Sequence, residues 1–176
     1  GIIMLSAKNI KSLEKYNHLM VYEKEVMKVL LSSPVLAELC KNRELKEDEI
    51  SELKWKNYFP SLFVEDTITD TEAYVMYNFD CEENYVADTY FDGKLVFQVY
   101  CHKDILRVPF GTSTRYSAII AELNRLFDNK NILGIALNSK TSDLILAPKN
   151  PKYVARQVVF SIKDIAERSM EYYNEK

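Results

Sequence analysis

The stretch Lys-Leu-Val-Phe-Gln-Val-Tyr-Cys, residues 94–101, decides the fold of this chain. Gln98 is the single polar residue between Leu95 and Tyr100. A nearly continuous apolar run predicts a strand that is covered on both faces or lies in an oligomer. The preceding Asp92-Gly93 is typical of a tight hairpin turn. We therefore expect a strand of a structural sheet, outside any catalytic site, followed by a long connection over Lys103–Thr112.

The segments on either side of this strand predict an α+β domain. Strands are expected at Ala73–Phe79, Leu133–Asn138, Leu144–Ala147 and Val154–Ile162, with a polar turn between the third and fourth of the five. Helices are expected at Leu19–Leu31, from Pro34 onward, at Lys46–Leu53 and at Arg115–Phe127. Grouped strands with segregated helices predict a mostly antiparallel sheet flanked by helices. Residues 1–18 form an N-terminal extension, 19–164 a single domain and 165–176 a C-terminal tail.

The composition excludes several classes of function. The formal net charge of −3 argues against a general nucleic-acid binder, which needs a cationic surface. Only four glycines are present, so glycine-rich phosphate loops are not expected. The three cysteines, at 40, 81 and 101, are typical of reduced thiols in a soluble intracellular protein. No apolar run reaches the roughly 20 residues of a membrane span.

The residues that most often carry catalysis do not form a catalytic group. His18 and His102 are the only histidines, and Cys101 precedes His102 at the end of a strand. Neighbouring strand residues point to opposite faces, so this pair cannot act as nucleophile and base. The chain has no Cys-x-x-Cys or His-x-x-x-His spacing. We therefore expect no enzyme, no catalytic residue, no cofactor and no metal site.

Two acidic features leave an alternative open. The loop expected at Asp80–Asn84 is rich in carboxylates, which divalent cations prefer, although such loops usually serve solubility. Asp80, followed by Asp92-Gly93-Lys94, resembles the metal-dependent PD-(D/E)xK nucleases, in which carboxylates hold magnesium and the lysine steadies the attacking water. This alternative requires that Asp80, Asp92 and Lys94 converge on one cation. It fails if Asp92-Gly93 is an exposed turn far from Asp80.

The chain from Trp55 onward resembles the tail terminator, or tail completion, proteins of long-tailed phages. The resemblance lies in the order of quoted stretches. These are Trp-Lys-Asn-Tyr-Phe-Pro at 55–60, Ala-Tyr-Val-Met-Tyr at 73–77, Lys94–Lys103, the helix Arg115–Phe127, Gly134–Leu137 and the strand Tyr153–Ile162. The N-terminal Leu5–His18 departs from the compact family pattern. Because of that difference, another neck component, such as a head-completion or connector protein, is an alternative. A third hypothesis is that the chain is a cytosolic binding module.

The resemblance implies a structural role in the virion. Such subunits form rings, commonly hexamers, that end the tail tube and face the neck, while DNA passes through the lumen unread. The implied partners are copies of the chain itself, the tail tube protein and a head-completion or neck protein, with no membrane involved. The implied location is the tail–neck junction of the virion, after assembly in the host cytoplasm.

The interface of such a ring is expected in three segments: Lys103–Thr112, Asp80–Asn84 and Ala166–Lys176. The candidate interface residues are Lys103, Arg107, Phe110, Arg115, Glu82, Glu83, Tyr172 and Tyr173.

Overall fold

The computed structural model describes residues 6–62, 66, 68–83, 90–132 and 135–165. It contains one six-stranded sheet in the order β1-β2-β3-β6-β5-β4. The strands are β1 Tyr58–Phe59, β2 Ala73–Glu83, β3 Tyr90–His102, β4 Asn131–Ile132, β5 Ile135–Leu146 and β6 Tyr153–Ile165. Only β1 and β2 are parallel, and every other pair is antiparallel. The α+β fold with a mostly antiparallel sheet is therefore confirmed.

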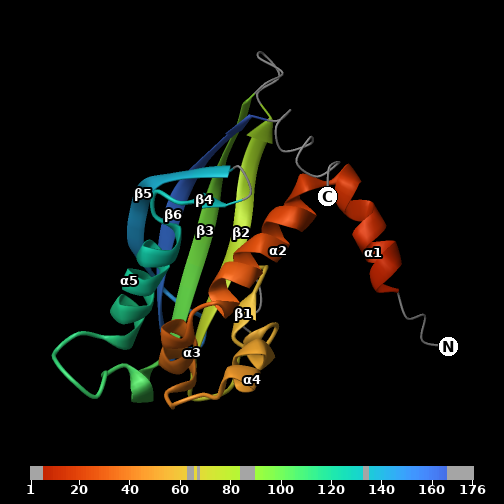
Figure 1. Cartoon of the computed structure of the whole chain (residues 1–176). Helices are drawn as coiled ribbons and strands as arrows, with labels where there is room; N and C mark the ends of the chain where they lie inside the picture. Colours follow the sequence, from red (N-terminus) through yellow and green to blue (C-terminus); the bar gives the residue numbers. More distant parts are fainter. Residues whose placement is uncertain (1–5, 63–65, 67, 84–89, 133–134, 166–176) are drawn as a thin grey trace.

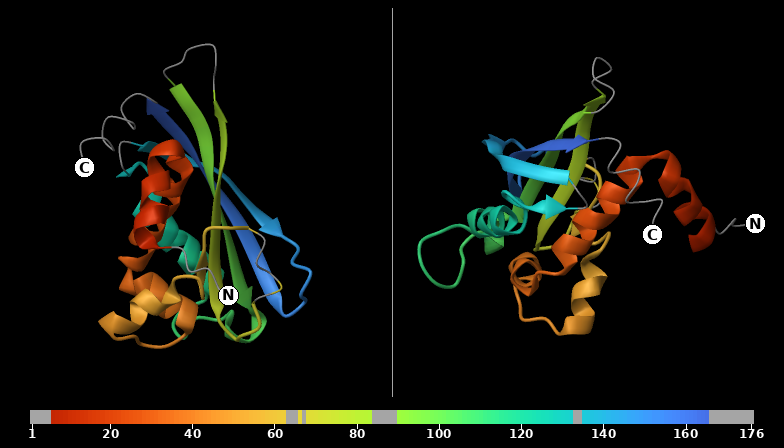
Figure 2. Two further views of the ribbon diagram at one scale, coloured as in Figure 1. Left: turned by 90° about the vertical axis from the view of Figure 1, so that its right-hand side faces the viewer. Right: turned by 45° about the horizontal axis from the view of Figure 1, so that its top comes forward.

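Helices cover one face of the sheet (Figures 1 and 2). The helices are α1 Ala7–Leu13, α2 His18–Leu31, α3 Pro34–Lys41, α4 Glu47–Ile50 and α5 Arg115–Phe127, with 3-10 turns η1 Glu14–Tyr16, η2 Ser51–Leu53 and η4 Lys103–Ile105. α1 buries none of its residues and leads away from the sheet (Figure 1). Among the described residues, no helix is both long and apolar enough to cross a bilayer.

Local sequence explains where the helices start. The Ser33 hydroxyl accepts the Leu36 N–H at 3.1 Å, and Pro34 occupies the first turn of α3, as proline prefers. The Thr114 hydroxyl accepts the Ser117 N–H at 3.3 Å and begins α5. Both starts agree with the sequence-based prediction.

The strand predicted to lie at the centre of the fold does so, because β3 pairs with both β2 and β6. Its alternate residues Leu95, Phe97, Val99 and Cys101 are fully buried under the helices. The Phe97 ring lies 4.8 Å from the Phe127 ring of α5, and 6.0 Å from Tyr77 and 5.9 Å from Phe160 on the neighbouring strands. Aromatic packing of this kind joins the sheet to α5.

The opposite face of the sheet carries a smaller apolar cluster. Its buried members are Phe59, Ile68, Tyr74, Met76, Tyr100, Tyr153 and Ala155. The Gln98 amide donates to the Gln157 carbonyl oxygen at 3.0 Å on this face. The apolar run at 94–101 therefore contributes side chains to the apolar clusters on both faces of the sheet. Its one glutamine, Gln98, is hydrogen-bonded to the neighbouring strand β6.

Two predicted turns are strand in the structure. Asp92 and Gly93 lie inside β3, where they pair with Glu82 and Cys81 of β2. The acidic residues Asp80–Glu83 accordingly belong to β2 and not to a loop. Because β6 pairs with the other side of β3 through Tyr90, the long ladder outweighs the local turn preference. The connection from β2 to β3 falls within residues 84–89, outside the described residues.

The two strands predicted at 133–138 and 144–147 are one strand, β5. The polar residues between them do not turn the chain. They shift the register of the ladder to β6, once between Leu137 and Lys140 and once between Lys140 and Ser142. Such bulges accommodate extra residues within a continuous strand.

Candidate assembly interface

β5 forms most of one edge of the sheet, because its outer neighbour β4 has only two residues. β4 pairs with Ile135 and Ala136, and the Asp128 carboxylate accepts the Lys140 N–H at 3.2 Å. In the described part of the chain, no strand pairs with the outer side of Ser142–Leu146. This stretch is therefore an open edge that can pair with another chain.

The open edge of β5 is apolar. The Ile145 side chain is 75% exposed and the Leu144 side chain 41% exposed. The nearby Asp143 carboxylate accepts hydrogen bonds from Arg156 at 2.5 Å and from Lys140 at 3.2 Å. Burial raises the pKa of Asp143, but these hydrogen bonds outweigh it and hold the pKa below its ordinary value. Asp143 thus offsets one of the two nearby cations, and one net positive charge remains beside the apolar pair.

The other edge is formed by β1 and β2. Among the described residues, β2 has an outer strand neighbour only at Val75 and Met76, which pair with β1. A tight turn before β1 places Trp55 at this edge with its side chain 58% exposed. The indole contacts the Phe59 ring edge-on, with 6.3 Å between the ring centres.

The turn holds Trp55 in an unusual backbone conformation. Its φ is +62°, in the left-handed region that bulky residues rarely adopt. The Trp55 N–H donates to Tyr58 O at 2.9 Å, and the N–H groups of Lys56 and Asn57 donate to Leu53 O at 3.0 and 2.8 Å. These hydrogen bonds fix the turn, so the exposed indole sits on a rigid support.

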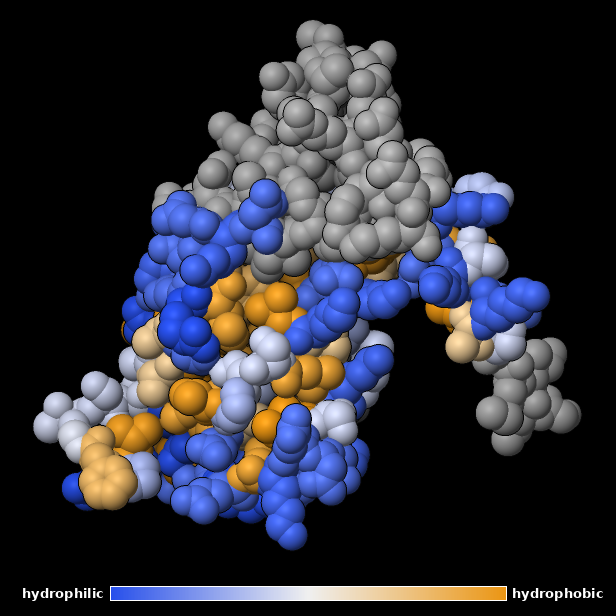
Figure 3. All heavy atoms as spheres, in the orientation of Figure 1, coloured by the Kyte–Doolittle hydropathy of each residue, from blue (hydrophilic) through white to orange (hydrophobic). Residues whose placement is uncertain are grey.

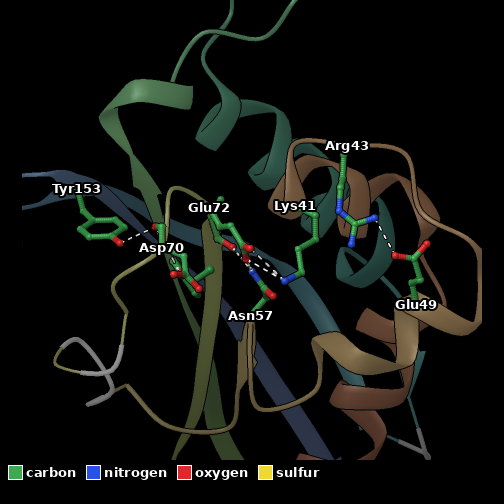
Figure 4. A network of polar contacts seen from close by, with 9 residues as sticks. Lys41, Arg43, Glu49, Asn57, Asp70, Glu72 and Tyr153 are labelled. Atoms are coloured by element: carbon green, nitrogen blue, oxygen red, sulfur yellow. Dashed lines mark hydrogen bonds and ion pairs between the residues drawn. The ribbon is translucent and has the colours of Figure 1, made fainter.

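A polar network anchors this turn to the sheet (Figure 4). The side-chain amide of the buried Asn57 donates to Glu72 at 2.7 Å and to Ala73 O at 3.0 Å, while the main-chain carbonyl of Asn57 accepts the Val75 N–H at 2.8 Å. Lys41, from α3, forms an ion pair with Glu72 at 3.1 Å. α3, the Trp55 turn and the start of β2 are therefore held in one arrangement.

The segment Lys103–Thr112, predicted as an interface loop, begins with η4 and then runs along the surface, and its interface role stays a prediction. The structure leaves Lys103 and Arg107 exposed, and the Phe110 side chain is 90% exposed. Gly111 follows with a φ of +87°, where a side chain would be strained. Figure 3 shows that apolar residues reach the surface at several places on the helix-covered face.

Arg115 is not an interface residue, because it is only 3% exposed. Its guanidinium donates to Ile105 O at 2.7 Å, to Leu39 O at 3.1 Å and to the Asn42 side chain. Among the described residues, no carboxylate forms an ion pair with it. Leu39 lies in the last turn of α3, whose carbonyl dipoles favour a cation. Arg115 thus joins α3, η4 and α5 inside the fold.

The other candidate interface residues lie wholly or partly outside the described structure. Glu82 and Glu83 have described backbones in β2, but their side chains are outside the description. Tyr172, Tyr173 and the segment Ala166–Lys176 are also outside it. Their interface role stays a prediction.

The geometry for a nuclease is only partly described. Asp80 lies directly opposite Lys94 in the β2–β3 ladder, so this pair is brought together. Asp92 lies in β3, and its side chain is outside the described structure. Asp92-Gly93 is not a turn, so the finding that would have excluded the nuclease hypothesis is not made. Within the described residues, no group of three or more histidines, cysteines or carboxylates could hold a metal ion.

The two described thiols are buried and poorly suited to chemistry. Burial raises the pKa of Cys101 to about 11, an effect that Arg115 partly opposes, and burial also raises the pKa of Cys40. Cys101 packs beneath the helices, whereas the His102 ring contacts Tyr153 at 5.2 Å in the other direction. The prediction that Cys101 and His102 cannot pair is therefore confirmed.

Sequence reasoning missed the two edge features, Trp55 and the pair Leu144–Ile145. The sequence held some indication that these side chains are exposed. Trp55 lies between two lysines, and Leu144 and Ile145 follow the charged Asp143. Nothing local indicates that β1 and β4 are too short to cover the neighbouring strands.

Comparison with known proteins gives one family. The family model described as YomW matches residues 17–162 of the chain, from just before α2 into β6. No curated protein matches the chain.

Proposed function

The chain belongs to the YomW family, and we propose that it is a virion structural protein that caps the tail tube of a long-tailed phage as a ring. The ring forms by self-association of identical chains. It joins the tail to the head–neck region, and DNA passes through its lumen. The placement on the tail tube follows the resemblance of residues 55–162 to tail terminator proteins.

The observation that carries this proposal is the pair of open edges of the sheet. β2 and β6 run in the same direction, since each is antiparallel to β3, and β5 runs opposite to both. A rotation about an axis parallel to the strands preserves their direction. The β5 edge of one copy would therefore meet the β2 edge of the next in antiparallel orientation, which suits hydrogen bonding.

Such a contact uses two different surfaces of the chain. Contacts of this kind form a closed ring when the rotation between copies divides a full turn evenly. The exposed Ile145 and Leu144 support the proposal, because an apolar open edge usually has to be covered to avoid uncontrolled association. The net charge of −3 agrees with a lumen that lets DNA pass without binding it.

A neck connector or head-completion protein is the alternative within the same class. It would also assemble as a ring but would bind the head side and not the tube. The position of the gene separates the two roles, because a terminator gene is expected between head-completion and tail-tube genes.

The experiment is native mass spectrometry of the purified chain, together with electron microscopy of tail tubes incubated with it. We expect a closed ring, as a hexamer, in solution or at one end of each tube. A chain that is monomeric in solution at high micromolar concentration and leaves tube ends bare refutes the proposal. Rings that bind heads but not tubes would support the connector role instead.

A further inference from the structure

We draw no further inference here: the strongest candidate, the exposed apolar face that Ile10, Leu13 and Tyr16 form on α1 and η1, carries none because nothing in the described residues shows what covers it.

Discussion

Replacement of Arg115 by methionine tests the assignment of this residue to the interior. Methionine keeps much of the apolar stem but removes the donors to Ile105 O, Leu39 O and the Asn42 side chain. Each abandoned buried acceptor costs about 1–3 kcal/mol, and the three losses are not additive. The change should therefore lower the free energy of unfolding by about 4 kcal/mol.

Urea unfolding followed by circular dichroism measures this effect. With a typical slope of about 2 kcal/mol per molar urea, the midpoint should fall by about 2 M. Arg107→Met is the matched control, because Arg107 is exposed on the same connection and its loss should change stability by less than about 0.5 kcal/mol. The reasoning is refuted if Arg115→Met is as stable as the control. It is also refuted if Arg115→Met abolishes assembly while stability stays unchanged, which would return Arg115 to the surface.

Three further predictions follow from buried polar groups. The hydrogen bonds from Arg125 lower the pKa of Glu122, so its ionised form stabilises the fold above the ordinary carboxyl pKa. That contribution is lost as the pH falls through the lowered value. Thermal melting between pH 7 and pH 3 should therefore fall less steeply for Glu122→Gln than for the unchanged chain. Cys40 and Cys101 are fully buried, so mass mapping should find them alkylated only after denaturant is added, and labelling of either in the native chain would contradict their burial. Asn57→Ala leaves Glu72 and Ala73 O without their amide donor and should destabilise the chain by about 2–3 kcal/mol in urea, whereas a change below 0.5 kcal/mol would mean that the network does not anchor the turn.

The sequence predicted the class of the fold because periodic patterns are local. The apolar run at 94–101 is long enough to indicate a buried strand without knowledge of its neighbours. The spacing of Ile119, Leu123 and Phe127 likewise indicates one buried face of α5, and the structure buries all three. Ser33-Pro34 marked the start of α3 through backbone chemistry alone.

The errors have a common origin in pairing between distant segments. Asp92-Gly93 has the local preference of a turn, but pairing with β2 and β6 extends β3 through it. The polar stretch within β5 has the composition of a turn, but the ladder to β6 absorbs it as shifts of register. In both cases, hydrogen bonds to strands far along the chain outweigh a preference of a few residues.

The candidate interface divides in the same way. The sequence alone determined that Phe110 follows Pro109 in a polar connection before α5, and the structure places its side chain on the surface. Arg115 has a charged side chain that sequence places on a surface by default, and only the packing of α3 against α5 provides the three acceptors that bury it.

What the sequence by itself determined is the set of elements, since side-chain periodicity and capping act over a few residues. What only the tertiary structure decided is which strand edges remain open. That depends on β1 and β4 having two residues each, and on the register in which they pair with β2 and β5. Register is a property of pairs of strands, so it exists only once segments separated by most of the chain have come together.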